Sequence, residues 1–124
     1  MNLNQVTIGS TDLARSERFY TALGLRLIVR DHHYLRFECP EGESTFSIEL
    51  VDDPAVDTAV TVYFETDRID ALYARLLEAG VPFDREPADM PWLWREARFR
   101  DPDGHRLCLF HAGANRKDPP WRLK

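Results

Sequence analysis

The feature that most constrains the fold of this chain is an internal repeat at a constant offset of 56 residues. In each half, a run of alternating polar and apolar residues leads into a helical stripe that ends at a glycine. A repeat of this length implies that neither half buries its apolar face alone, and that the halves pair around a shared core or cleft. The offset superposes Val6 on Val62, Ile8 on Phe64, Leu13 on Ile69, Tyr20 on Leu76, Gly24 on Gly80 and Leu25 on Val81.

Each half is predicted to form one strand, one helix and then three strands. The first helix is expected over residues 12–23, with Asp12 as a capping residue and Gly24 as the left-handed C-terminal cap. The second helix follows a stripe that begins at Ile69 and ends before Gly80. The expected strands are residues 5–8, 25–30, 33–39 and 45–51 in the first half, and 59–65, 81–85, 95–100 and 106–111 in the second.

The predicted boundaries give one domain made of two modules. Module 1 spans about residues 1–53, a linker covers 54–58, module 2 spans about 59–112, and a tail covers 113–124. A chain of 124 residues is too short for two independent domains of usual size. The tail carries Pro119, Pro120 and Trp121, which predict an extended strap pinned by one aromatic side chain and not a helix.

Charge and apolar content exclude several classes of partner. The 16 Lys and Arg residues are scattered among 21 Asp and Glu residues, so no basic block is available to follow a phosphate backbone. The apolar stretches are short and the N-terminus lacks a signal pattern, so no membrane partner is expected. Cys39 and Cys108 form no CxxC pair, which favours a reduced, cytoplasmic protein.

Strand alternation assigns one face of each sheet to its helix and leaves the opposite face polar. Apolar residues such as Phe46 and Ile48 belong under the helix. One polar face of an antiparallel sheet is usually solvated, whereas two such faces can enclose a pocket. The candidate ligand-binding residues on these faces are Gln5, Thr7, Arg36, Glu38, Ser47, Thr61, Tyr63, Glu96, Arg98 and Cys108, with Glu49 as a further candidate.

A loop at the rim of the second sheet carries two tryptophans. If residues 90–94 are extended, Trp92 and Trp94 point to opposite sides, so that one packs inward and the other faces the cleft. A tryptophan there supplies a flat wall for an aromatic ligand, or else it packs in the core or in a dimer interface. Both interpretations stay open, and both tryptophans are kept as candidate ligand-binding residues.

The order of several short segments resembles a known superfamily. These segments are residues 5–9, Asp12 with Leu13, Ser16, residues 19–20, residues 23–25 and residues 99–105 with their Asp-Pro-Asp-Gly turn. In this order the chain resembles the vicinal oxygen chelate superfamily of glyoxalases, bleomycin resistance proteins and extradiol dioxygenases. The resemblance implies an α+β fold in which two βαβββ modules form a curved mixed sheet with a concave cleft, helices on the outer face, and a homodimer. It does not imply one reaction.

The resemblance also implies where a metal would bind. Gln5 and Glu49 match the ligand positions of the first module, and Thr61 and Cys108 stand at the corresponding positions of the second. A threonine hydroxyl is a poor ligand for Zn, Ni or Fe, and a buried cysteine is more often a small hydrophobic residue. The donor set is therefore incomplete, and we expect no cofactor. The alternative is one divalent ion such as Zn, Ni, Mn or Fe on Gln5 and Glu49.

Three functions follow from these alternatives. The first is a small-molecule-binding protein or metal-free enzyme that holds a small organic molecule in a polar cleft. In that case Glu49 acts as a general base if the cleft excludes water, or pairs structurally with Arg36 or Arg98. The second is a metal-dependent lyase or isomerase similar to glyoxalase I, and the third is a degenerate module that serves protein association.

Overall fold

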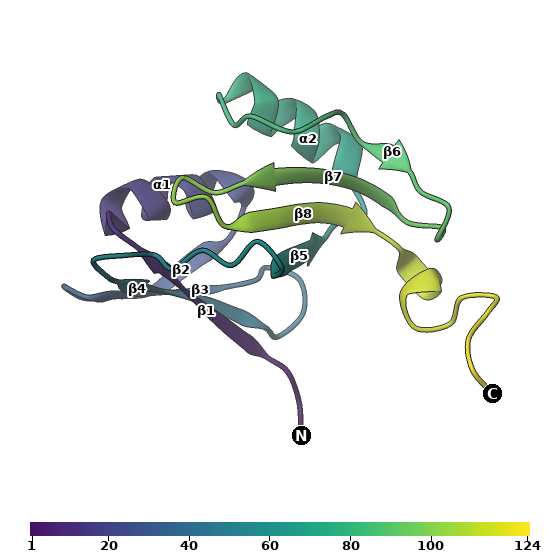
Figure 1. The fold of residues 1–124 in the computed structure, drawn as a ribbon, viewed down its shortest axis with the longest axis horizontal. Coiled ribbons are helices and arrows are strands. Elements are labelled where there is room, and N and C mark those ends of the chain that lie inside the picture. The colour runs from purple at the N-terminus through teal and green to yellow at the C-terminus, as the bar shows by residue number, and fades with distance from the viewer. The chain divides into compact units, whose positions relative to one another are not determined.

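The computed structural model describes residues 1–124 and divides into two compact units. Unit 1 consists of residues 1–57 and the turn Asp101–Gly104, and unit 2 consists of residues 58–100 and 105–124. Each unit contains one four-stranded sheet and one α-helix (Figure 1). Neither helix is long and apolar enough to cross a bilayer.

Unit 1 has the predicted order of one strand, one helix and three strands. The sheet order is β1-β4-β3-β2, in which β1 runs parallel to β4 and the other neighbours are antiparallel. The elements are β1 (Gln5–Ser10), α1 (Leu13–Leu23), β2 (Arg26–Arg30), β3 (Tyr34–Glu38) and β4 (Thr45–Leu50).

Helix α1 begins and ends where its capping residues predict. The Asp12 side chain accepts a hydrogen bond from the backbone N–H of Arg15 at 3.0 Å, which satisfies one of the free donors of the first turn. Gly24 ends the helix at φ 112°, a conformation that favours glycine. Between these caps, Tyr20 is fully buried with its ring 4.8 Å from that of Phe46. The helix therefore covers the apolar face of the sheet.

Unit 2 repeats the arrangement of unit 1. Its sheet order is β5-β8-β7-β6, and β5 runs parallel to β8. The α+β fold of two βαβββ modules is thereby confirmed. The elements are β5 (Thr61–Glu65), α2 (Ile69–Glu78), β6 (Ala88–Asp89), β7 (Arg95–Arg100), β8 (Arg106–His111) and the 3-10 helix η1 (Gly113–Arg116).

Strand register confirms the offset of the repeat at the first strand of each module. Val6 pairs with Phe46 in unit 1, and Val62 pairs with Leu107 in unit 2. Phe46 and Leu107 are both buried, so the same face is apolar in the two sheets. The predicted alternation holds because shifting the pairing of the strands by one residue would move these apolar side chains to the solvent-facing side of the sheet.

Two sequence predictions about unit 2 are wrong. The second strand was expected over residues 81–85, but the segment that pairs with β7 is Ala88–Asp89, and Phe83 forms only an isolated bridge to Phe99. Pro82 has no N–H to donate, which explains why no ladder forms there. The tail also begins with the helix η1, and the Trp121 side chain is 57% exposed instead of pinning a strap.

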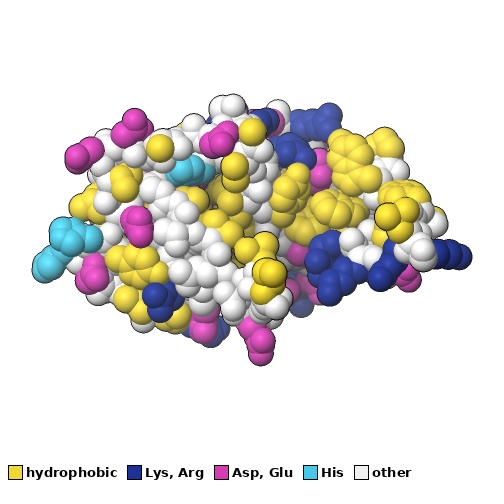
Figure 2. Space-filling model, turned by 60° about the horizontal axis from the view of Figure 1, so that its bottom comes forward, with side chains coloured by type: hydrophobic (Ala, Val, Ile, Leu, Met, Phe, Trp, Pro, Cys, Tyr) yellow, Lys and Arg dark blue, Asp and Glu magenta, His cyan; other side chains and the backbone are white.

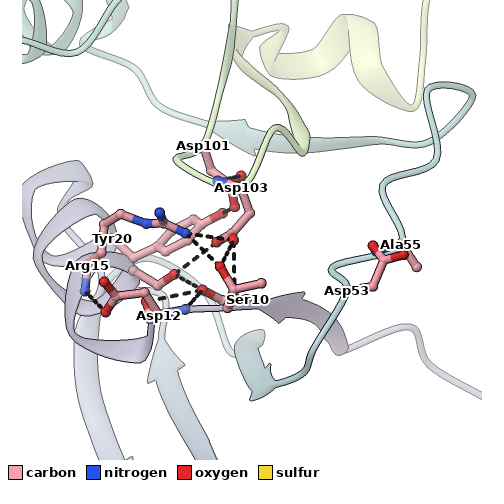
Figure 3. A network of polar contacts seen from close by, with 10 residues as sticks. Ser10, Asp12, Arg15, Tyr20, Asp53, Ala55, Asp101 and Asp103 are labelled. Carbon is pink, nitrogen blue, oxygen red and sulfur yellow. Dashed lines mark hydrogen bonds and ion pairs between the residues drawn. The ribbon is translucent and has the colours of Figure 1, made fainter.

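The Asp-Pro-Asp-Gly turn belongs to unit 1, where it contacts α1 (Figure 3). Tyr20 Oη donates a hydrogen bond to Asp101 Oδ2 at 2.7 Å. Asp103 Oδ1 accepts from Arg15 Nη2 at 2.7 Å and from the backbone N–H of Thr11 at 3.1 Å. The Asp103 side chain is only 2% exposed, whereas that of Arg15 is 37% exposed, so the carboxylate is the buried member of this pair. The turn is thus a structural part of unit 1.

Replacing Asp103 with asparagine is expected to lower the free energy of unfolding at pH 7 by about 1–3 kcal/mol. Desolvation acts to raise the pKa of Asp103, but hydrogen bonds from Ser10 and Thr11 and the charge of Arg15 outweigh it, so the pKa lies below 3.8. A lowered folded-state pKa adds stability at higher pH, and this stability is lost as the pH falls through that pKa. Urea unfolding should show the difference between wild type and variant shrinking below about pH 5. A constant difference down to pH 3 would contradict this account.

Candidate functional site

In unit 1, the sheet face opposite α1 carries a hydrogen-bonded row of polar side chains. Tyr34 Oη donates to Ser47 Oγ at 2.5 Å, and Arg36 Nε donates to Tyr34 Oη at 2.9 Å. The Arg36 guanidinium carbon lies 5.3 Å from the centre of the Tyr34 ring, a cation–π arrangement. Burial acts to raise the pKa of Tyr34, but the contacts with Ser47 and Arg36 outweigh it and lower the pKa below its usual value. This row is a polar and cationic surface.

The other residues predicted on this face are more exposed and partly paired with each other. Thr45 Oγ1 donates to Gln5 Oε1 at 2.8 Å, and Arg26 Nη1 donates to Glu38 Oε1 at 2.7 Å. Thr7 lies exposed on β1. These contacts are surface interactions of small energetic value.

Glu49 and Gln5, the pair proposed as metal ligands, do not fit a shared ion. Gln5 pairs with Thr45 across β1 and β4, whereas Glu49 lies four residues further along β4 beside Gly9. At about 3.3 Å per residue, the two positions are about 13 Å apart along the strand. Side chains that stand roughly perpendicular to the sheet do not bridge that distance to one ion. Glu49 is also exposed at the strand end, so it does not lie in the water-excluded setting that the proposed general-base role requires.

In unit 2, the corresponding face carries an aromatic cluster, which we define as Tyr63, Trp94 and Phe110. Trp94 stacks on Phe110 with ring centres 4.7 Å apart. The Tyr63 ring stands edge-on to both, at 6.1 Å from Trp94 and 5.6 Å from Phe110. Phe110 is buried, whereas Tyr63 is 43% exposed, so the cluster has an accessible side.

A charged pair lies beside the aromatic cluster. Arg98 Nε donates to Glu96 Oε1 at 3.1 Å, and Arg98 Nη2 donates to Tyr63 Oη at 3.1 Å. Burial acts to lower the pKa of Arg98, but the contacts with Tyr63 and Glu96 outweigh it and raise the pKa. Glu96 is only 4% exposed, and its Oε2 is buried without a hydrogen-bond partner. The face therefore combines flat rings, a cation and a half-satisfied carboxylate.

Cys108 lies beneath this layer, and its predicted correspondence with Glu49 is wrong. Register pairs Cys108 with Arg98, as it pairs Ser47 with Arg36, so the counterpart of Cys108 is Ser47. The Cys108 side chain is fully buried. Desolvation and the nearby charge of Glu96 raise the pKa of its thiol to about 12. The thiol is therefore protonated at neutral pH and is neither a ready metal ligand nor a nucleophile.

The rim segment is a loop, as expected, but it is not extended. Residues 90–93 close a tight turn in which Leu93 N–H donates to the Met90 carbonyl, and Leu93 has φ 66°. Trp94 joins the aromatic cluster, whereas Trp92 is 40% exposed.

Thr61 is half-buried on β5. Figure 2 shows hydrophobic side chains beside Lys and Arg at the end of the molecule where Figure 1 draws the C-terminal segment.

Sequence reasoning missed two residues of these faces. Tyr34 and Phe110 have the same strand parity as Arg36 and Cys108, respectively, and register confirms that they share those faces. Parity was therefore the signal that identifies them.

With this geometry established, comparison with known proteins identifies the family. The profile of the Glyoxalase/Bleomycin resistance protein/Dioxygenase superfamily matches residues 2–109. The chain belongs to this superfamily. Among curated proteins, none matches the sequence significantly.

Solved structures of superfamily members share this fold. A glyoxalase/bleomycin resistance protein/dioxygenase from Nocardioides is 27% identical, with a TM-score of 0.76 over 100% of this chain and 90% of that chain. A bleomycin-binding protein complexed with bleomycin is 19% identical, with a TM-score of 0.70 over 90% of this chain and 98% of that chain. A lactoylglutathione lyase from Agrobacterium tumefaciens is 15% identical, with a TM-score of 0.73 over 98% of this chain and 97% of that chain.

Proposed function

We propose that this superfamily member binds a small organic molecule on the polar face of the unit 2 sheet. The observation that carries the proposal is the aromatic cluster with the Arg98–Glu96 pair at its side. Stacked rings offer apolar area, and a few fixed polar groups beside them orient a ligand, which is the usual composition of a small-molecule site. The structural likeness to a bleomycin-binding protein adds a relative that holds an organic molecule on this fold.

The chemistry of the face favours binding over catalysis. Cys108 is a protonated thiol under the rings, and Glu49 is exposed at the end of a strand in the other sheet. The carboxylate beside the aromatic cluster, Glu96, is held in an ion pair with Arg98, so the groups at this face are arranged for binding and not for attack on a substrate. We accordingly propose sequestration or transport of the ligand, with recognition by stacking and by the polar groups of Glu96 and Arg98.

The likeness to a lactoylglutathione lyase, at 15% identity, extends to the fold alone. Gln5 on β1 and Glu49 on β4 are four residues apart in the strand register, which does not fit a shared metal ion and so does not favour the metal-dependent alternative. Ligand binding in unit 2 is therefore expected to persist after exhaustive treatment with EDTA. Homodimer formation and a cytoplasmic location stay predictions.

Replacing Trp94 with leucine is expected to weaken the binding of aromatic ligands at least tenfold. The change removes the ring that stacks on Phe110 while keeping an apolar side chain, and a stacked aromatic anchor contributes about 1.4 kcal/mol or more. The measurement is an NMR screen of an aromatic fragment library against isotope-labelled protein, followed by calorimetric titration of the strongest fragment with and without EDTA.

The matched control for this experiment is Trp121→Leu. Trp121 lies in the C-terminal segment, is 57% exposed and is not part of the aromatic cluster. The control is expected to bind the fragment as the wild type does. Equal losses in the two variants, or fragments that perturb only unit 1, would refute the proposed site. Loss of binding in EDTA with recovery on adding Zn or Ni would instead support the metal-dependent alternative.

A further inference from the structure

We infer that the polar face of the unit 1 sheet holds a binding site of its own, in which the Arg36 guanidinium binds the carboxylate or phosphate group of a small organic anion. The inference goes beyond the proposed function, which concerns the face in unit 2. Three observations carry it: the guanidinium is fixed in place, two of its nitrogens are accessible without an acceptor, and no carboxylate pairs with it.

Arg36 is held in place by contacts that begin at a buried residue. Ser47 is fully buried on β4 and lies directly across from Arg36 in the strand register. Ser47 Oγ accepts from Tyr34 Oη at 2.5 Å, and Tyr34 Oη accepts from Arg36 Nε at 2.9 Å. The guanidinium carbon also lies 5.3 Å from the centre of the Tyr34 ring. A guanidinium that is fixed before a ligand arrives loses less conformational entropy on binding than a mobile one does.

The outer end of the Arg36 guanidinium is open. The contact with Tyr34 uses only Nε, and the Nη1 and Nη2 atoms make no hydrogen bond or ion pair. The buried side-chain nitrogen and oxygen atoms without a partner are Arg15 Nε and Glu96 Oε2, so both Nη atoms of Arg36 reach solvent. Arginine donates in a planar fork that matches two oxygens of a carboxylate or a phosphate. The fork of Arg36 can therefore bind such a group through both Nη atoms.

The internal repeat explains why this arginine lacks a carboxylate partner. Arg36 and Arg98 occupy equivalent register positions in the two sheets. Two residues before Arg98 stands Glu96, whose Oε1 accepts from Arg98 Nε at 3.1 Å. Two residues before Arg36 stands Tyr34, which accepts the same kind of hydrogen bond through a phenol oxygen. The positive charge is thus paired in unit 2 and unpaired in unit 1, so only Arg36 is expected to attract an anion.

Two carboxylates share the polar face with Arg36, and neither pairs with it. Glu38 forms an ion pair with Arg26 at 2.7 Å. Glu49 lies across from Tyr34 in the strand register, exposed at the end of β4, and forms no ion pair with Arg36. Solvent and salt screen such an exposed charge, so Glu49 weakens the attraction of an anion to Arg36 without blocking the site.

The test uses three probes with one saturated ring and different head groups: cyclohexanecarboxylate, cyclohexyl phosphate and the neutral cyclohexanecarboxamide. A saturated ring forgoes the stacking that the aromatic cluster of unit 2 offers, so the head group decides the affinity. NMR titration of the full chain, followed at the Arg36 Nε–H signal, is expected to show both anions binding at least about tenfold more tightly than the amide. The tighter of the two anions identifies the preferred oxyanion.

Charge-changing variants test the role of Arg36. Arg36→Gln should abolish the difference between the anions and the amide, and Arg36→Lys, which keeps the charge without the planar fork, should retain only part of it. Glu49→Gln removes a negative charge from the same face and should tighten anion binding. The matched control is Arg30→Gln, because Arg30 is on the same sheet but pairs with Glu17 of α1 at 2.8 Å. This control should bind all three probes as the wild type does, and circular dichroism verifies that each variant is folded.

Tyr34 provides a second reporter that needs no variant. Burial acts to raise the pKa of Tyr34, but the contacts with Ser47 and Arg36 outweigh it and lower the pKa. An anion on Arg36 offsets the charge of the guanidinium, so the pKa of Tyr34 should rise when the anion is bound. The carbon-13 signal of the ring carbon that bears the hydroxyl measures this titration.

Four results would overturn the inference. They are an amide that binds as tightly as the anions, an Arg36→Gln variant with unchanged anion affinity, a Glu49→Gln variant with weakened anion affinity, and a Tyr34 pKa that stays constant at saturating anion. Anions that shift only the indole N–H signal of Trp94 also contradict the site in unit 1. In each of these cases the proposed function of unit 2 stands, because the aromatic fragment screen with Trp94→Leu tests it separately.

Discussion

Replacing Tyr20 with alanine is expected to lower the free energy of unfolding by about 3–5 kcal/mol, a large fraction of the stability of a small domain. Tyr20 is fully buried between α1 and the sheet of unit 1, and its ring lies 4.8 Å from that of Phe46 and 6.0 Å from that of Phe37. Truncation to a methyl group removes these contacts and leaves a cavity that close packing around it cannot fill. It also removes the hydroxyl that donates to Asp101.

The two contributions of Tyr20 are separable. Tyr20→Phe keeps the ring and removes only the hydrogen bond to Asp101, so it is expected to cost about 1–3 kcal/mol. Tyr63→Phe is the matched control, because the Tyr63 side chain is 43% exposed and its hydroxyl contacts Arg98 near solvent. Urea unfolding followed by circular dichroism measures all three variants. If Tyr20→Phe costs no more than Tyr63→Phe, the buried hydrogen bond does not have the role assigned to it.

Tyr20 also shows how far sequence reasoning reaches in this fold. The repeat and the 3.6-residue stripe place it on the buried side of α1, because period and capping are local properties of the chain. Its partner Asp101 is 81 residues away in sequence and lies in the turn between β7 and β8. No local pattern identifies such a pair. The sequence therefore predicted the element and the face, while the polar contact needed the structure.

For the candidate site too, the sequence predicted which face a residue lies on but not which residues lie next to each other. Alternation assigned Glu96 and Arg98 correctly to the polar face, since side-chain direction in a strand has a period of two. Alternation says nothing about position along the strand, and a shift of two residues leaves parity unchanged. The resemblance matched Glu49 with Cys108 as ligand positions of the same parity, whereas register matches Ser47 to Cys108. We therefore expect no metal site at the four matched positions, because ligands must meet within about 2.0–2.6 Å of one ion.

This register leads to the second large effect: Cys108→Glu is expected to lower the free energy of unfolding by about 3–5 kcal/mol and to create no metal site, with or without Thr61→His. Position 108 is fully buried beneath Trp94 and Phe110, and a carboxylate there lies next to the buried Glu96 and must share Arg98, which already pairs with Glu96. Two neighbouring buried carboxylates repel each other, and burial disfavours the charged form of each.

Two controls separate burial from the mere addition of charge to β8. Cys108→Val, an apolar change of similar volume, is expected to cost less than about 1.5 kcal/mol. His111→Glu places a carboxylate at an exposed position of the same strand and is expected to change stability by less than about 0.5 kcal/mol. Urea unfolding measures stability, and calorimetry with Ni or Zn measures metal binding. A folded Thr61→His, Cys108→Glu variant that binds Ni or Zn with submicromolar affinity would contradict the register on which the assignment of the unit 2 face depends. In the described arrangement, a carboxylate at position 108 could reach an ion only through the stacked rings of Trp94 and Phe110. Tight metal binding would therefore mean that the unit 2 face is not built as described above.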